Sequence, residues 1–312
     1  MKKTMLLLVL ISTYHFLFSQ NEDLVLLGKG NALYEMIDYE FDFDGELENL
    51  DTTTIEGKIK HEILNTQKEN ILKKSLYYFE ELMEEFPESD LYFRAMNNAA
   101  SVSYQLGDDQ KAIKYYNSIL GSRANDKEEG GVGSGIMAEQ YALYKNGACK
   151  RLAEIYIERK EFKKAIKCIK LTEKYPYRHF CGNAYATNDI YIATLYTRSY
   201  KGMGDIKRAL NYSLPHIFDN GLASNEELVE LTVQILKENF DSENVVAEFE
   251  KACAEYYSEK KKRKKYEWTE YFITFLDTKI ELPFYELRYT ENAYEVIEKH
   301  LKESYFKKLI TK

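Results

Sequence analysis

The sequence has little proline, tryptophan or histidine: its 312 residues include four prolines, one tryptophan and five histidines. Scarce proline disfavours a body of many short strands and turns, and abundant Glu, Lys, Leu and Ala favour helices. The histidines lie far apart, so the H-E-x-x-H pattern of zinc proteases is absent. We therefore expect an all-α fold without a catalytic metal.

Other motifs that carry enzyme chemistry are missing as well. The sequence has no G-x-S-x-G elbow, and its glycine-rich run, residues 130–135, neither follows an expected strand nor ends in Gly-Lys-Ser/Thr. His179 and Cys181 share one loop and could contribute to a metal or reactive site, but we favour an ordinary loop. We expect no enzymatic activity and no cofactor, and a glycosidase with paired carboxylates is the enzyme class left open.

Cysteines are few, and their spacing matches no metal-binding motif. Cys149, Cys168, Cys181 and Cys253 include no C-x-x-C pair. Four cysteines allow three complete disulfide pairings, between which the sequence does not choose. We favour free thiols that lie partly in the core.

The chain begins like a secretory protein. Lys2 and Lys3 precede an apolar run that ends near Phe18, and the small residue Ser19 follows. Polar residues interrupt the run, which disfavours a membrane-spanning helix of about 20 apolar residues. We expect a signal peptide cleaved after Ser19, with an uncleaved anchor as the alternative. The mature chain is then exported without a membrane span, to the periplasm, the cell surface or the medium.

The charge balance is acidic. The chain has 43 basic and 51 acidic residues, and removal of residues 1–19 takes away two lysines and no acid. This balance disfavours nucleic acid and anionic lipid as partners and is compatible with a basic partner. We expect the basic run Lys260–Lys265 to lie on a solvated helix face. We expect Trp268 and the neighbouring aromatic residues to lie in the core.

A repeated pattern runs through the middle of the chain. In four segments a basic residue precedes a small one, an aliphatic residue follows, and further bulk comes three or four residues on: Lys74–Phe79, Lys111–Tyr116, Lys164–Ile169 and Arg208–Ser213. The last three segments follow a break at Gly107-Asp108, Lys160-Glu161 and Gly204-Asp205. Upstream of each break, apolar or small residues recur at i, i+3, i+4 and i+7, the spacing of one helix face. The pattern predicts helical hairpins whose small residues allow close packing.

With these residues the chain resembles the tetratricopeptide repeat family over residues 66–222. Gly107, Ala112, Tyr115 and Tyr116 match best, and Phe86-Pro87 closes the first unit as a proline commonly does in that family. The family period is about 34 residues, whereas the small residues Ser75, Ala112, Ala165 and Ala209 are 37, 53 and 44 apart, so insertions separate the units. The resemblance implies stacked antiparallel hairpins, an α-solenoid.

The flanking regions receive coarser expectations. Residues 1–19 are the signal peptide, 20–65 an N-terminal segment with a loose acidic connector at 38–55, 66–222 the repeats, and 223–312 a C-terminal helical cap. The first unit's leading helix is expected within 50–65, and capping boxes at Thr66–Glu69 and Ser224–Glu227 are expected to open helices. We expect a long charged helix over Val245–Lys264 and a final helix over Thr290–Ile310.

In stacked hairpins the leading helices line a concave surface. The polar face of each expected leading helix supplies the candidate partner-binding groove: Arg94, Asn97, Ser101, Tyr104, Lys150, Glu154, Tyr191, Arg198 and Lys201. By resemblance, Asn97, Lys150 and Arg198 could hold an extended peptide by its terminal carboxylate. We expect an exported scaffold or adaptor that holds a protein or peptide. A secreted inhibitor or immunity-type protein that neutralises a basic partner is the alternative, and a solvated polar face is the plain interpretation of these residues.

Overall fold

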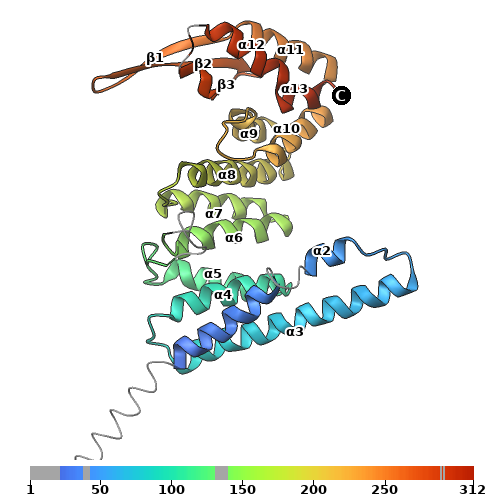
Figure 1. Cartoon of the computed structure of the whole chain (residues 1–312), viewed down its shortest axis with the longest axis vertical. Coiled ribbons are helices and arrows are strands. Elements are labelled where there is room, and N and C mark those ends of the chain that lie inside the picture. Colours follow the sequence, from blue (N-terminus) through green and yellow to red (C-terminus); the bar gives the residue numbers. More distant parts are fainter. Residues whose placement is uncertain (1–21, 38–42, 131–139, 289, 291) are drawn as a thin grey trace, which may run out of the picture. The chain divides into compact units, whose positions relative to one another are not determined.

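The computed structural model describes residues 22–37, 43–130, 140–288, 290 and 292–312. These residues are mostly helical, as the composition predicts, with one small sheet (Figure 1). The chain divides into two compact units, Met1–Lys127 with Ala142–Ala148 and Glu128–Tyr141 with Cys149–Lys312. The predicted signal peptide and most of the glycine-rich run lie outside the described residues. Among those described, no helix is both long and apolar enough to cross a bilayer.

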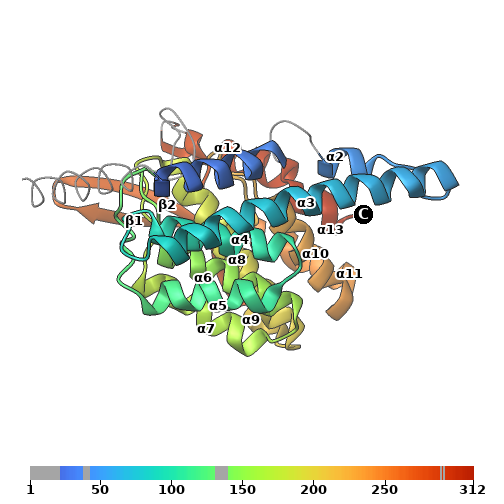
Figure 2. The same cartoon turned by 90° about the horizontal axis from the view of Figure 1, so that it is seen from below.

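In the described part of the first unit, all regular secondary structure is helical. Its elements are a helix over residues 22–37 that ends in a π turn, α2 (Phe43–Glu48), α3 (Ile55–Glu85), α4 (Tyr92–Gln105), α5 (Asp109–Gly121) and the start of α6 (Tyr144–Glu158). Helix α4 packs against both α3 and α5, which Figure 2 shows from below. Leu72, Phe79 and Leu82 of α3 meet Ala95 and Ala99 of α4 in the core.

The small residues of the repeated pattern are all buried. The side chains of Ser75, Ala112, Ala165 and Ala209 are fully inaccessible to solvent. Each of these four residues lies within a helix. A small side chain at a buried position of a helix lets the backbone of another helix approach closely. The expectation that these positions do not face water is confirmed.

The leading partner of the first signature segment is not where we expected it. Residues 55–65 belong to α3 itself, which continues unbroken through the signature. The helix over 22–37 takes the partner's place, because the Ser75 hydroxyl donates a hydrogen bond of 2.8 Å to the Gly30 carbonyl. A Cβ at Gly30 would lie 2.4 Å from the Phe79 ring, so this contact requires glycine. The prediction failed because the pairing skips an intervening stretch of sequence.

The loose acidic connector and the first capping box are also corrected. Part of the connector forms α2, whose Phe43 is buried. Helix α3 begins at Ile55 because the Thr54 hydroxyl accepts a hydrogen bond of 3.0 Å from the Gly57 amide. Thr66 lies inside this helix and donates to the Glu62 carbonyl instead of capping a new one.

The second unit continues with helices and then changes character. It contains the rest of α6, α7 (Phe162–Lys174), α8 (Gly182–Gly202), α9 (Ile206–Ser213), the 3-10 turn η3 (Leu214–His216), α10 (Glu226–Asn239), α11 (Ser242–Ala254), β1 (Tyr257–Arg263), β2 (Tyr266–Phe275), β3 (Thr278–Glu281), η4 (Tyr285–Arg288), α12 (Ala293–Glu303) and α13 (Tyr305–Ile310). Helix α8 packs on α7, α9 and α10. Helix α7 ends before Tyr175-Pro176 and α9 before Pro215, as the prolines predict.

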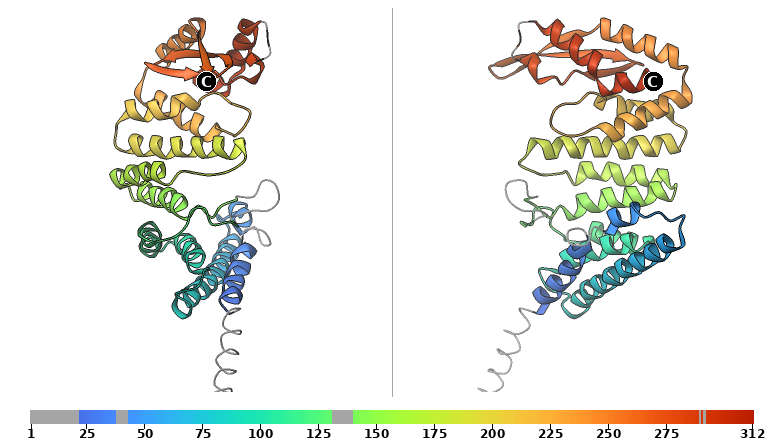
Figure 3. Two further views of the ribbon diagram at one scale, coloured as in Figure 1. Left: turned by 90° about the vertical axis from the view of Figure 1, so that its left-hand side faces the viewer. Right: turned by 45° about the vertical axis from the view of Figure 1, so that its right-hand side comes forward.

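The helix expected over Val245–Lys264 is wrong in its second half. Helix α11 ends at Ala254, and the following residues form an antiparallel sheet of order β1-β2-β3 within the described chain. Strand β2 is rich in aromatic and β-branched residues, which favour strands, and it holds the Lys-rich β1 in register from Tyr257↔Phe272 to Arg263↔Tyr266. Tertiary pairing therefore overrides the helix propensity of Lys and Glu. Figure 3 shows the sheet and α11, orange to red, side by side.

Two further C-terminal expectations change in detail. Helix α10 forms as predicted, but its N-cap residue is Asn225, whose side-chain amide donates to the His216 carbonyl (2.6 Å) instead of capping the helix. The expected final helix is broken at Ser304, whose hydroxyl accepts from the Lys307 amide (3.2 Å) and so starts α13. A small sheet therefore interrupts the C-terminal helices that we expected to form a cap.

The core of the C-terminal part gathers around Phe249 of α11. Its ring centroid lies 5.1 Å from that of Phe306 and 5.4 Å from that of Phe275. Trp268 and Tyr266, which we expected in this core, are instead 44% and 67% exposed. Position along the strand explains the difference: residues 266–269 are exposed on both faces of β2, whereas Phe272, Ile273 and Phe275 at its other end are buried.

Candidate functional site

The predicted groove residues of the second unit lie on two helices that the sequence pattern predicts to be the first members of hairpins. Lys150 and Glu154 are on α6, and Tyr191, Arg198 and Lys201 are on α8. Residues three, four and seven apart share one helix face, so the α8 residues form a single row. We call these five residues, with the residues that bind them, the leading-helix face.

Lys150 lies among aromatic rings. Its ammonium is 4.9 Å from the centre of the Tyr177 ring and 5.7 Å from that of Tyr191, distances typical of cation–π contacts. The same nitrogen donates a hydrogen bond of 3.3 Å to the Asn188 side-chain oxygen. Tyr177 comes from the loop after α7, whereas Asn188 and Tyr191 belong to α8. Lys150 thus joins α6 to the loop and to α8.

The loop beside Lys150 is ordered by His179. This buried ring stacks on Phe180 and, less closely, on Tyr177, and its Nδ1 accepts a hydrogen bond of 2.9 Å from the Cys181 amide. The His179 amide in turn donates to the Tyr185 hydroxyl (3.1 Å). The contacts of His179 and Cys181 are those of an ordered loop. In the described residues no group of three or more His, Cys, Asp or Glu side chains is placed to hold a metal ion.

The cations of α8 pair with acidic residues of α10. Arg198 forms a hydrogen-bonded ion pair with Glu227, and the Lys201 ammonium lies 3.2 Å from a Glu238 carboxylate oxygen. Glu238 also accepts a hydrogen bond of 2.6 Å from Gln234. The sequence pattern missed these α10 glutamates because acidic residues on a helix surface are too common to single out.

These ion pairs are exposed and therefore easily exchanged. The side chains of Arg198 and Glu227 are 48% and 68% exposed, so water and salt screen their attraction. A surface pair of this kind contributes about 0–1 kcal/mol to stability. A partner's carboxylate could replace Glu227 at little energetic cost.

The candidates on α4 belong to the first unit and have other partners. Ser101 lies within hydrogen-bond distance of the Tyr34 hydroxyl (3.2 Å), so it joins α4 to the helix over 22–37. Asn97 donates to the neighbouring Asn98 (3.3 Å), which in turn donates to Asn31 (2.9 Å). Arg94 and Tyr104 are half-buried on the same helix. Ser101 and Asn98 thus contribute to packing between α4 and the helix over 22–37.

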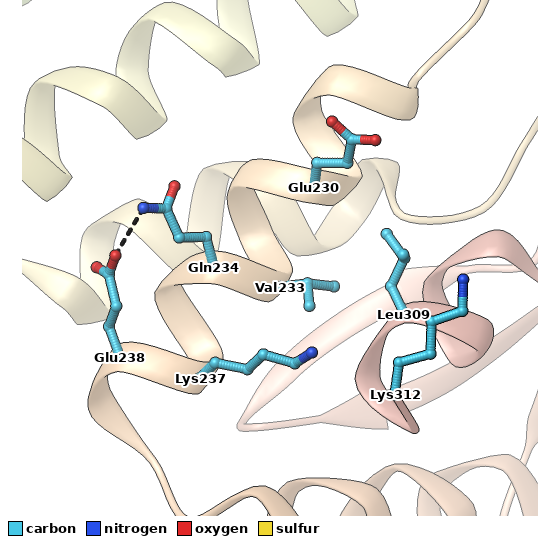
Figure 4. Close-up of a pocket in the computed structure, with 7 residues that line it drawn as sticks. All are labelled: Glu230, Val233, Gln234, Lys237, Glu238, Leu309 and Lys312. Atoms are coloured by element: carbon cyan, nitrogen blue, oxygen red, sulfur yellow. Dashed lines mark hydrogen bonds between the residues drawn. The ribbon is translucent and has the colours of Figure 1, made fainter.

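A shallow pocket adjoins the leading-helix face in the second unit. It has a volume of about 480 Å³ and lies between α10 and the C-terminal end of α13. Figure 4 shows Glu230, Gln234 and Glu238 along α10, with Lys237 extending toward Leu309 and Lys312. Gln234 and Glu238 link the pocket to Lys201. No pattern in the sequence indicates this pocket, because α13 packs on α10 from far along the chain.

The four cysteines are free thiols in this structure, and Cys149 and Cys168 are buried. Burial raises the pKa of the Cys168 thiol to about 11 and that of Cys253 to about 12. Both groups are therefore protonated and unreactive near neutral pH. The interpretation of free thiols partly in the core fits these positions.

Comparisons with known proteins add no relative. No protein-family model matches the sequence, and no curated protein sequence matches it.

Proposed function

We propose that the chain is an exported scaffold of the tetratricopeptide-repeat type that holds an extended protein segment on its leading-helix face. Buried small residues, paired helices and glycine turns at the predicted breaks support the repeat assignment. In this proposal α6, α8 and α10 act as successive leading helices of stacked hairpins.

The observation that carries the proposal is the regular chain of polar contacts across these helices. Lys150 of α6 bonds to Asn188 of α8, and Arg198 and Lys201 of α8 bond to glutamates of α10. The result is a surface of alternating cations, amides and carboxylates that an extended backbone and its charged side chains can match. Tyr177 and Tyr191 add flat apolar area next to the first cation.

A double charge reversal tests the proposal. We expect Lys150→Glu with Arg198→Glu to abolish capture of the partner from the native envelope, identified by mass spectrometry, while circular dichroism shows unchanged helicity. Lys163→Glu with Lys167→Glu is the matched control, because both lysines are exposed on the trailing helix α7. The control changes the net charge equally and should leave capture intact.

A second control separates the local charge from the ion pair. Exchanging the partners, Arg198→Glu with Glu227→Arg, restores an ion pair between α8 and α10 with the charges reversed. If the partner needs a cation at position 198, this exchanged variant also loses affinity. Undiminished capture by the Lys150/Arg198 double variant would exclude the leading-helix face.

The exposed glutamates of α10 favour the inhibitor as the second candidate. Glu226, Glu227, Glu230 and Glu238 are all exposed on this helix, and a basic toxin or enzyme would find complementary charge there. In that case association weakens steeply with salt, and Glu226→Gln with Glu230→Gln reduces it more than Lys150→Glu does.

A further inference from the structure

The hairpin of β1 and β2 carries a charge opposite to that of the whole chain. Residues 257–268 contain six basic and two acidic residues, whereas the chain has a net charge of −8. In Figure 1 the closed end of this hairpin extends past the helices of its own unit. Every residue from 262 to 268 is exposed. The hairpin therefore presents concentrated positive charge beyond the helices of its own unit.

Several of these cations have no carboxylate nearby. Lys261 and Lys262 pair with Glu259 and Glu267, both at 2.7 Å. By contrast, Lys260, Arg263 and Lys264 form no ion pair with any residue in the described part of the chain. A cluster of unneutralised cations at one end attracts anionic groups over several ångströms.

Two aromatic side chains share this end of the hairpin. Tyr266 lies directly opposite Arg263, and Trp268 directly opposite Lys261, so these four side chains lie on one face of the sheet. The rings are 67% and 44% exposed, and the Trp268 indole nitrogen donates to Glu270 (2.8 Å). Such rings have an apolar body and a polar edge, the property of side chains that settle at a lipid–water interface.

Lys264, at the turn of the hairpin, has a backbone conformation that residues with a side chain rarely adopt. Lys264 has φ of 55°, in the left-handed region where glycine or asparagine is favoured. Lysine at position 264 is less favourable for the backbone than glycine or asparagine would be, but it places a positive charge at the hairpin end. Strained positions of this kind are found more often at functional sites.

We propose that the end of the β1–β2 hairpin, Lys260 to Trp268, is a docking site for the anionic phosphate headgroups of a lipid membrane. The cations contact phosphates while Tyr266 and Trp268 enter the headgroup layer. The acidic balance of the whole chain led us to expect no binding to anionic lipid, but six basic residues gather in one hairpin, and Lys260, Arg263 and Lys264 form no ion pair within the described residues. The end of a projecting hairpin suits a flat surface, and exposed rings beside cations suit the depth of a bilayer interface.

Trp268 makes the site directly observable, because it is the single tryptophan of the chain. Its fluorescence is measured on the full chain, and on a form without residues 1–19 to exclude binding by the apolar leader. The probes are vesicles of phosphatidylglycerol and phosphatidylethanolamine in equal parts, and vesicles of phosphatidylcholine alone. With the phosphatidylglycerol vesicles, but not with the phosphatidylcholine vesicles, we expect the Trp268 emission to shift to shorter wavelength and to be protected from quenching by acrylamide. Both effects should be lost at about 0.5 M salt, where the screening length falls to a few ångströms.

Two triple variants provide a matched comparison. Lys260→Gln, Arg263→Gln and Lys264→Gln remove three hairpin cations, and each cation near an anionic surface contributes about fivefold to binding, so affinity should fall about hundredfold. Lys163→Gln, Lys167→Gln and Lys170→Gln remove three exposed α7 lysines that form no ion pair within the described residues. The second triple variant should bind vesicles as the parent does. Tyr266→Ala should weaken binding to the anionic vesicles by a factor that changes little with salt below about 0.5 M, because it removes an apolar contact that salt does not screen.

Three outcomes overturn the proposal. One is the absence of any Trp268 shift with anionic vesicles at low salt. Another is an equal loss of binding in both triple variants, which would mean that net charge alone acts. The third is a shift with soluble heparin or DNA but not with vesicles, which would assign the hairpin to an anionic polymer.

Discussion

Lys160 has the same backbone conformation and hydrogen bonds as Gly204. Their φ angles are 58° and 74°, and each lies between two helices, directly before the N-cap residue of the second one. The Glu161 amide donates to the Tyr156 carbonyl (2.7 Å), and the Asp205 amide donates to the Tyr200 carbonyl (2.9 Å). The two turns therefore have the same structure, with lysine at the left-handed position in one and glycine in the other.

Lys160→Gly should stabilise the protein. The left-handed conformation costs a residue with a side chain about 1–2 kcal/mol, and glycine avoids part of this cost. We expect the free energy of unfolding to rise by about 0.5–1 kcal/mol in denaturant titrations. Gly204→Lys is the reciprocal control and should lower it by a similar amount, because a Cβ at Gly204 meets no other atom within 4 Å. A stability loss in Lys160→Gly would show that the lysine side chain contributes more than the turn.

Phe249→Ala should strongly destabilise the protein. The side chain is fully buried and contacts Phe275 and Phe306, so truncation leaves a cavity that these rings cannot fill. Removal of a buried phenylalanine costs about 3–5 kcal/mol. Chemical denaturation followed by circular dichroism measures the change. Tyr266→Ala, an exposed aromatic of the same unit, should change stability by less than about 0.5 kcal/mol.

Stability should fall in mildly acidic solution because of His216. Burial holds the pKa of this imidazole below its ordinary value, so the folded chain binds a proton less readily than the unfolded chain. The free energy of unfolding therefore decreases as the pH drops below about 6.5. Denaturation at pH 7.5 and pH 5 measures the decrease. His216→Gln should reduce the difference between the two pH values, and an unchanged difference would assign it to other groups.

The Cys168 and Cys253 thiols should resist alkylation. With the pKa of Cys168 near 11 and that of Cys253 near 12, few thiolates exist at pH 8. We expect iodoacetamide to label these two residues in denaturant but only slowly in the folded protein, as read by peptide mass spectrometry. Rapid labelling of Cys253 in the folded state would mean that the contact of α13 with α11 opens readily.

The repeated pattern predicted local structure well where its signals are local. The placement of Ser75, Ala112, Ala165 and Ala209 on helices, the Gly–Asp turns and the helix ends before prolines all depend on residues within one or two helical turns. The helix ends at Tyr175 and Ser213 follow the same rule. Helix periodicity and backbone conformation are properties of short segments, so a single sequence reveals them.

The predictions that were wrong concern contacts between residues that lie far apart in the sequence. The partner of Ser75 is Gly30, 45 residues away, and the strand identity of Lys260–Arg263 depends on pairing with β2. At the candidate site, the positions of Lys150, Arg198 and Lys201 could be predicted from helix spacing. Their partners Tyr177, Glu227 and Glu238 could not, because they depend on contacts between elements.

Helix α3 is much longer than the part of it that packs in the core. It covers Ile55–Glu85, yet its buried leucines and Phe79 begin at Leu72, while Ile55, Ile59 and Ile63 are at least half exposed. Amide hydrogens near the start of this helix should therefore exchange with deuterium long before those near Phe79 do. Limited proteolysis should cleave this chain within residues 55–63 while the remainder of α3 stays intact. The two ends of one continuous helix should therefore differ in how readily they unfold locally.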